Sequence, residues 1–224
     1  MTSSVVRSPS SVAKRGCGLP LLRTTDYGLR TKDMKILKVE KLTDEKWVNL
    51  FAAHYEHNGH VGRWVFASRK QTPHTGTEGD AVIVTAVLHA DGAPPRLVLI
   101  REFRIPVGGY VYGLPAGLLE RGEPASECVR RELLEETGLE LVAVRRLTPP
   151  LFSSAGLTDE TAAMAFVDVR AVDGVGPKLE ASEDLEVVLV DQEQAGRLVA
   201  DPTLRTDAKA WMVLYLFAQL GRVA

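Results

Sequence analysis

The chain has 224 residues, 45% of them hydrophobic and 25% charged, which is enough to bury a core without disulfides or structural metals. Its 27 Lys and Arg nearly balance 29 Asp and Glu, so nucleic acid and membrane surfaces are not expected partners. Two cysteines cannot form a disulfide framework or a four-cysteine zinc site. No apolar run approaches the roughly 20 residues that span a bilayer.

Residues 1–33 differ in composition from the rest of the chain. Ser, Lys and Arg are frequent, and Asp26 is the only acid before Asp33. Without apolar periodicity, this segment is predicted to be a disordered or loosely docked extension. The alternative is an organelle transit peptide, which has a similar basic, Ser-rich composition. The segment has no apolar region typical of secretion, so the cytoplasm is the expected location, with organelle import left open.

Residues 34–72 are predicted to form a small antiparallel β domain. Lys35 to Leu42 alternates as a strand does, and two apolar runs, 47–55 and 61–68, flank Asn58-Gly59. Asn-Gly between apolar runs is typical of a tight hairpin. The polar residues 71–80 are predicted to be a linker to the main domain, residues 73–224.

The main domain is predicted to mix strands and helices. Ala81–His89 and Arg96–Arg104 form a hairpin, and the Gly- and Pro-rich residues 106–122 form a loop. A helix is expected over Pro124–Thr137, with Pro at the first helical position and Gly138 just past the end. Further strands are expected over residues 141–146, 162–169 and 185–190, and helices over residues 192–200 and 207–220.

The predicted helix over 124–137 carries the chemistry. Glu132, Glu135 and Glu136 are spaced i, i+3, i+4, so their carboxylates share one face. Mg²⁺ and Mn²⁺ prefer such oxygen ligands and share them with substrate phosphates. Arg131 is placed to orient one carboxylate by a charge-assisted bond. The alternative is a solvated acidic face balanced by Arg130 and Arg131.

The residues around this helix fill a longer pattern. Residues 117–139 read GLLERGEPASECVRRELLEETGL. They match every fixed position of G-x5-E-x7-R-E-U-x-E-E-x-G-U, where U is aliphatic. This pattern is the Nudix box, and the chain resembles the Nudix hydrolases.

The resemblance extends over about residues 35–220, to the branch that cleaves ADP-ribose and related nucleotide sugars. Arg101–Arg104, Leu114–Gly117 and Asp207–Lys209 are similar to segments of that branch. The resemblance implies an α/β/α Nudix sandwich preceded by an N-terminal antiparallel β domain. That small domain packs or swaps across a homodimer in the branch, and an isolated hairpin would be marginally stable. A homodimer is therefore expected.

The resemblance also implies a metal site. Glu132 and Glu136 are expected to bind divalent cations, with Glu135 close by and the carbonyl of Ala116 as a further ligand. The expected ion is Mg²⁺, with Mn²⁺ as the alternative. Arg131 is expected to orient the helix and the preceding loop, together with Glu123.

The second active-site loop of the family matches residues 153–160. Glu160 is the candidate general base or metal ligand, and Asp159 is the alternative to it. The alternative for Glu160 itself is an ordinary loop acid. Glu160, Glu135 and Arg131 make up the predicted catalytic set.

The predicted substrate-binding residues come from several segments. Trp47 and Trp64 resemble tryptophans that stack an adenine between two subunits; the alternative is that both are core residues. Arg69 and Arg104 match arginines that contact the diphosphate or terminal ribose, and the alternative for each is a surface salt bridge. Leu118 is included in the substrate-binding set.

One position departs from the branch. ADP-ribose-specific members carry a proline 16 residues after the box, and Ala155 occupies that position here. The expected function is Mg²⁺-dependent cleavage of ADP-ribose, or a related nucleoside-diphosphate sugar, to a nucleoside monophosphate and a sugar phosphate. One alternative is a sensor that binds the nucleotide sugar without cleaving it. The other is a Nudix hydrolase of GDP-mannose, UDP-glucose, NADH or oxidised nucleoside triphosphates.

Overall fold

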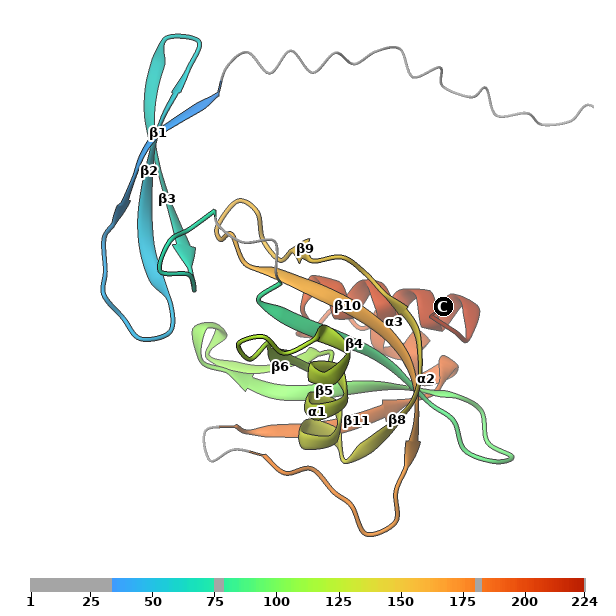
Figure 1. The fold of residues 1–224 in the computed structure, drawn as a ribbon. Helices are drawn as coiled ribbons and strands as arrows, with labels where there is room; N and C mark the ends of the chain where they lie inside the picture. The colour runs from blue at the N-terminus through green and yellow to red at the C-terminus, as the bar shows by residue number, and fades with distance from the viewer. Residues whose placement is uncertain (1–33, 75–78, 180–182, 224) are drawn as a thin grey trace, which may run out of the picture.

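The computed structural model describes residues 34–74, 79–179 and 183–223. The predicted extension over residues 1–33 and the centre of the predicted linker lie outside the described residues. Within the described part, two β-sheets and three α-helices account for the architecture (Figure 1). None of these helices has both the length and the apolar character needed to cross a bilayer.

The first sheet is the predicted N-terminal antiparallel sheet. It consists of β1 (Lys35–Lys41), β2 (Asn49–His57) and β3 (His60–Ser68), in that spatial order. Asn58 and Gly59 have φ angles of 52° and 75°, the left-handed conformation that a tight hairpin turn requires. The predicted hairpin is therefore confirmed.

The second sheet has eight strands, and its main path runs β11-β5-β4-β10-β8. The two central strands, β4 and β10, are parallel over eight residue pairs, and the other strand pairs are antiparallel. The strands are β4 (Ala81–Leu88), β5 (Arg96–Arg104), β6 (Gly109–Gly113), β7 (Ala116–Leu118), β8 (Leu139–Leu147), β9 (Leu151–Phe152), β10 (Thr161–Ala171) and β11 (Leu185–Val190).

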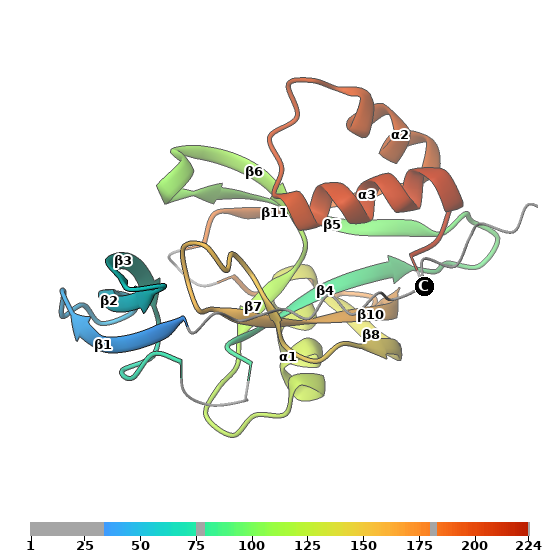
Figure 2. The same cartoon turned by 90° about the horizontal axis from the view of Figure 1, so that it is seen from above.

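The centre of this sheet opens between β4 and β5. The two strands pair only at Val87–Leu97 and Leu88–Arg96. Beyond those pairs, β4 continues with β7 and β5 continues with β6, so the two halves diverge (Figure 2). The expectation that residues 106–122 form only a loop is therefore wrong. The separated edges of β4 and β5 need backbone partners, and segments of this Gly-rich stretch supply them.

Helices cover both faces of the second sheet. α1 (Ala125–Thr137) packs against one face, where Val129 and Leu133 are fully buried. α2 (Gln192–Ala200) and α3 (Ala208–Leu220) cover the other face, with Phe217 fully buried (Figure 2). The predicted α/β/α sandwich is confirmed.

The start of α1 differs from the prediction in one detail. Pro124 is the N-cap residue, with φ −64° and ψ 141°, rather than the first helical residue. An N-cap residue has an extended ψ angle. The proline ring fixes φ near −65°, and this φ is compatible with the N-cap position as well as with the first helical position. Gly138 ends the helix in the left-handed conformation, as predicted.

Candidate active site

Strand β7 lies directly against α1. The Ala116 amide donates a hydrogen bond to Glu136 Oε2 at 3.0 Å. A Cβ atom at Gly117 would overlap with the Glu132 carboxylate, so only glycine allows this approach. The first glycine of the box is therefore explained by the packing of Glu132 onto the β7 main chain.

Replacing Gly117 with Ala should displace the Glu132 carboxylate, because the added methyl group and the carboxylate would occupy the same space. A misplacement of about 1 Å at a reacting centre costs on the order of 100-fold in rate. For the hydrolysis of a nucleoside-diphosphate sugar that the resemblance implies, we expect at least that loss in kcat/KM in G117A. Gly196→Ala on α2 is the matched control, since an added methyl group there meets open space; equal losses in both variants would contradict this explanation.

Arg131 is the centre of the hydrogen-bond network between α1 and the loop that precedes it. Its Nε and Nη2 atoms donate to the two carboxylate oxygens of Glu123, both at 2.9 Å. Nη2 also donates to the Leu118 carbonyl at 3.1 Å. Nη1 donates to Glu132 at 2.6 Å and to Glu135 at 3.3 Å. The predicted orienting role therefore has a geometric basis, with three carboxylates held rather than one.

Glu123 responds strongly to this contact. Hydrogen bonds from the Arg131 guanidinium and from the Glu120 amide lower the pKa of Glu123 to about 2. The same pairing raises the pKa of Arg131 above its ordinary value. Both groups are therefore charged at neutral pH, and the loop over residues 118–123 is fixed to α1 by a bidentate ion pair.

Glu136 and Glu132 are the buried carboxylates of the cluster. Glu136 is only 7% exposed, and burial raises its pKa to about 8, opposed by the hydrogen bond from the Ala116 amide. The negative charges of Glu132, Glu183 and Glu102 contribute to this rise of the Glu136 pKa. Burial also raises the pKa of Glu132, and the bond from Arg131 opposes that shift. The protein alone therefore does not fully compensate the negative charge gathered here.

The chemistry of this donor set fits a hard divalent cation. Glu132, Glu136 and the half-exposed Glu135 supply carboxylate oxygens beside the Ala116 main chain, and such cations prefer oxygen ligands. A cation would offset the like charges that raise the carboxylate pKa values. Over residues 34–74, 79–179 and 183–223, no three Asp, Glu, His or Cys side chains form a ready-made metal cluster.

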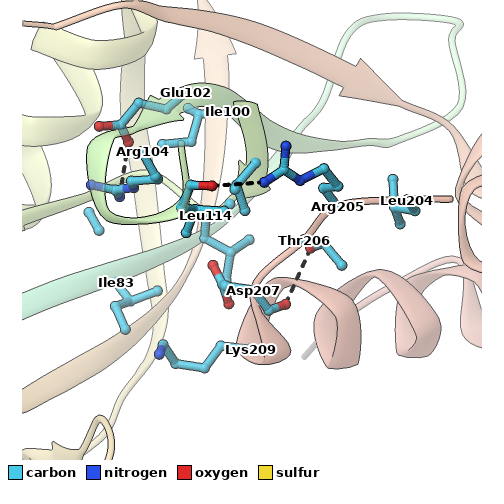
Figure 3. Close-up of a pocket in the computed structure, with 14 residues that line it drawn as sticks. Ile83, Ile100, Glu102, Arg104, Leu114, Leu204, Arg205, Thr206, Asp207 and Lys209 are labelled. Carbon is cyan, nitrogen blue, oxygen red and sulfur yellow. Dashed lines mark hydrogen bonds and ion pairs between the residues drawn. The ribbon is translucent and has the colours of Figure 1, made fainter. Parts of the chain in front are cut away.

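A cleft of about 550 Å³ occupies the opening between β4 and β5 (Figure 3). Two of the predicted site residues, Ala116 and Arg104, line it. Arg104 Nη2 lies 2.9 Å from Glu102 Oε2, and Glu102 in turn interacts with the Glu136 charge. The cleft therefore lies next to the carboxylates of α1.

The loop that carries Glu160 is docked on the small N-terminal sheet. Arg69 Nε donates to Glu160 Oε1 at 2.7 Å, and the Ala67 amide donates to the Leu157 carbonyl at 2.8 Å. Asp159 Oδ2 accepts a hydrogen bond from the His74 amide at 3.1 Å. The structure thus brings two predicted residues together, Arg69 and Glu160. It pairs Glu160 with Arg69 rather than with the groups on α1.

The two predicted tryptophans lie in different surroundings, and neither is a core residue. Trp64 is 55% exposed, donates to the Gly156 carbonyl at 3.2 Å, and lines an apolar pocket of about 470 Å³. Trp47 is 65% exposed, with the Lys46 ammonium 4.3 Å from its ring centre. Other aromatic residues around the Trp64 pocket are Tyr55, Phe66, His74 and Phe152.

Sequence reasoning assigned no role to the residues that close the cleft on the α3 side. Arg205, Thr206, Asp207 and Lys209 all line it (Figure 3). Their segment resembled the ADP-sugar branch, but resemblance alone gave no reason to place it at the site. A lysine in the first turn of a helix, where cations are disfavoured, was the feature that could have indicated them.

Comparisons with known proteins agree with this geometry. The sequence profile of the NUDIX domain matches residues 77–213, more than half of the chain. The chain therefore belongs to the Nudix family, as the box predicted.

Two relatives and one solved structure are informative. The chain is 31% identical over 144 residues to ADP-ribose pyrophosphatase of Saccharomyces cerevisiae, covering 62% of this chain and 62% of that protein. It is 29% identical over 181 residues to ADP-sugar pyrophosphatase of Mus musculus, covering 77% and 82%. A crystal structure of an ADP compounds hydrolase superposes with a TM-score of 0.58 at 23% identity, covering 84% and 93%. At that identity, the structure supports the fold alone.

Proposed function

We propose that this chain is a Nudix pyrophosphohydrolase that cleaves the diphosphate of ADP-ribose or a related nucleoside-diphosphate sugar. The products are a nucleoside monophosphate and a sugar phosphate. The observation that carries the proposal is the packing of Glu132 and Glu136 of α1 against the Ala116–Gly117 main chain, at the edge of the cleft. The relatives named for ADP-ribose and ADP-sugars support the substrate class.

The carboxylates of α1 would hold the catalytic cation, which we expect to be Mg²⁺. Glu132, Glu136 and the Ala116 carbonyl are the proposed ligands, with Glu135 as a further one. A bound divalent cation would neutralise diphosphate charge and activate a water molecule for attack. Arg131 fixes the position of the Glu132 carboxylate relative to strand β7, because it donates hydrogen bonds both to Glu132 and to the Leu118 carbonyl.

Glu160 is the proposed general base. Water adds to one phosphorus, the bridging oxygen leaves with the other phosphate, and the proton released by water passes to the Glu160 carboxylate. The ion pair with Arg69 fixes the orientation of that carboxylate. Arg69 and Arg104 are also proposed to contact the diphosphate or the terminal ribose, because guanidinium groups bind phosphate oxygens in pairs. Leu118, 41% exposed beside Arg131, is proposed to contact the substrate.

The Trp64 pocket is the proposed site for the base. An aromatic ring stacked on a base contributes about 1–3 kcal/mol, and Trp64 lines the pocket with other aromatic residues. We propose that Trp47 of the partner subunit completes the stack in a homodimer.

In this homodimer, we propose that residues 34–72 form the dimerising β domain and residues 73–224 form the catalytic domain. The exposed apolar side chains of residues 34–72 support this arrangement, because large apolar patches on a protein surface mark interaction sites. Light scattering should show a dimer, and a stable monomer with full activity would contradict the shared base site. Within residues 34–72, the large apolar residues that are more than half exposed are Met34, Ile36, Leu37, Trp47, Val61 and Trp64.

The function is tested by offering the purified protein a panel of substrates with Mg²⁺. The panel contains ADP-ribose, ADP-glucose, GDP-mannose, UDP-glucose, NADH and nucleoside triphosphates. We expect AMP and ribose 5-phosphate from ADP-ribose at the highest kcat/KM, and no products when EDTA removes the metal. Because Ala155 replaces the proline of the ADP-ribose branch, the other sugars belong in the panel. Binding of ADP-ribose without release of AMP would overturn the proposal and indicate a sensor.

A further inference from the structure

A second cleft, of about 330 Å³, lies at the opposite end of β4 from the candidate active site. Its walls come from the last residues of β4 and the loop that follows, from β8 and β10, and from the segment after α3. Ile83 lines the first cleft, whereas His89 lines the second. A strand rises about 3.3 Å per residue, so these two residues lie roughly 20 Å apart. The second cleft is therefore a separate site.

Asp168 of β10 organises the polar side of this second cleft. Its side chain is only 15% exposed, and its Oδ1 atom lies 3.0 Å from His89 Nε2. The other oxygen, Oδ2, pairs with Nε and Nη2 of Arg145. Both carboxylate oxygens thus have partners, and they fix the orientation of the imidazole and of the guanidinium. This pairing leaves His89 Nδ1 and Arg145 Nη1 for a further partner.

Arg222 brings a second guanidinium to the same cleft. It follows the C-terminus of α3, whose partial negative charge favours a cation at this position. Over residues 34–74, 79–179 and 183–223, no acidic side chain pairs with Arg222. Two arginines and one aspartate give the cleft a formal charge of about +1, or about +2 when His89 is protonated. The cleft is therefore suited to an anion.

The rest of the second cleft is apolar, which points to an organic anion rather than a bare ion. Pockets for small molecules combine apolar walls with a few charged groups, and have volumes of about 300–1,000 Å³. At about 330 Å³, this cleft is at the small end of that range. Its size suits a charged group attached to a single ring. The apolar lining residues are Val87, Pro95, Phe166 and Val223.

We propose that this second cleft binds a phosphate monoester of a small molecule, through the guanidinium groups of Arg145 and Arg222 and the imidazole of His89. A phosphate monoester carries a charge of about −1.5 to −2 near pH 7 and three acceptor oxygens. Guanidinium groups bind such oxygens in pairs. A carboxylate offers only two oxygens and one charge to donors that come from three segments of the chain. The site shares no residue with the candidate active site and does not depend on the proposed function.

The proposal is tested by nuclear magnetic resonance of the histidine rings during titration with phosphate monoesters. The chain has five histidines, and the His89 resonance is assigned by its absence in His89→Gln. EDTA keeps divalent cations out of the candidate active site, and the pH is held constant. Ribose 5-phosphate and AMP are the two probes. We expect a saturable shift of the His89 resonance, while ribose, which lacks the phosphate, leaves it unchanged.

Three variants determine whether the shift reports phosphate held in this cleft. Arg222→Met should weaken binding by about 10- to 100-fold, as loss of a charged hydrogen bond does. Arg222→Lys keeps the charge and should retain affinity within about threefold. The control Arg197→Met removes an exposed positive charge from α2 and should bind as the wild type does. Unchanged resonances of the other four histidines in R222M would show that the fold is retained.

Two results would overturn the proposal. The first is a His89 resonance in the wild-type protein that moves no more with either monoester than with sodium chloride at the same ionic strength. The second is equal affinity of R222M and the wild type. Saturable binding of either monoester supports the proposal, and the tighter of the two identifies the source as a sugar phosphate or a nucleotide. No step of this titration requires hydrolysis, so failure of the proposed function would leave its outcome unaffected.

Discussion

Replacing Glu136 with Gln should lower kcat for AMP release from ADP-ribose by about 1,000-fold, a loss in the range expected for groups that act on charge or protons at the reacting centre. The amide oxygen of Gln can still accept the hydrogen bond from the Ala116 amide, so the fold should be retained. The negative charge that would hold the cation is lost. Steady-state kinetics with Mg²⁺ measures the effect, and circular dichroism checks the fold.

Glu127→Gln is the matched control on the same helix. Glu127 lies on the exposed side of α1, 4.0 Å from Arg130. Removing its charge should leave kcat within about twofold of the wild type, since surface substitutions away from a site have small effects. If E136Q turns over as fast as E127Q, the assignment of Glu136 as a metal ligand is wrong.

The second large effect concerns stability. Replacing Arg131 with Met leaves the carboxylates of Glu123 and Glu132 without their partner, and both are largely buried. Breaking a buried ion pair from one side costs about 3 kcal/mol or more, because the remaining charge is uncompensated. We expect the free energy of unfolding in urea to fall by that amount. Activity should fall as well, since the loop ending at Glu123 loses its anchor.

Arg130 provides the comparison at the neighbouring position. Its side chain is 57% exposed, and its nearest acidic partner, Glu127, is 4.0 Å away. Arg130→Met should therefore change the free energy of unfolding by less than about 0.5 kcal/mol. Similar losses in R130M and R131M would show that the network around Arg131 does not carry this stability.

Local sequence features predicted most of the elements and the family. Asn58-Gly59 fixes a hairpin because both residues tolerate positive φ. The helix ending at Gly138 was predicted from its termini, and the box residues gave the family that the NUDIX profile confirms. These features depend on neighbours in sequence, which is why they could be read without the structure.

Structural features that depend on contacts between residues far apart in the sequence could not be predicted from local patterns. β6 and β7 form because β4 and β5 separate, and turn-type residues alone cannot show that separation. Lys209 reaches the cleft only because α3 packs across the opened sheet. The pairing of Arg69 with Glu160 joins residues 91 positions apart, and no spacing rule connects them.

The docking of residues 153–160 on β3 ties the loop that carries the proposed general base to the small sheet. Trp64 and Ala67 of β3 hold the backbone of that loop, and Arg69 just after the strand holds the Glu160 carboxylate. A shortened chain without β1–β3 would keep the whole Nudix box, but the loop that carries Glu160, the proposed general base, would lose these contacts. Substitutions in the small sheet and in the 153–160 loop are therefore coupled through these contacts. A chimera that combines either part with the corresponding part of another protein would have to restore the hydrogen bonds of Trp64, Ala67 and Arg69.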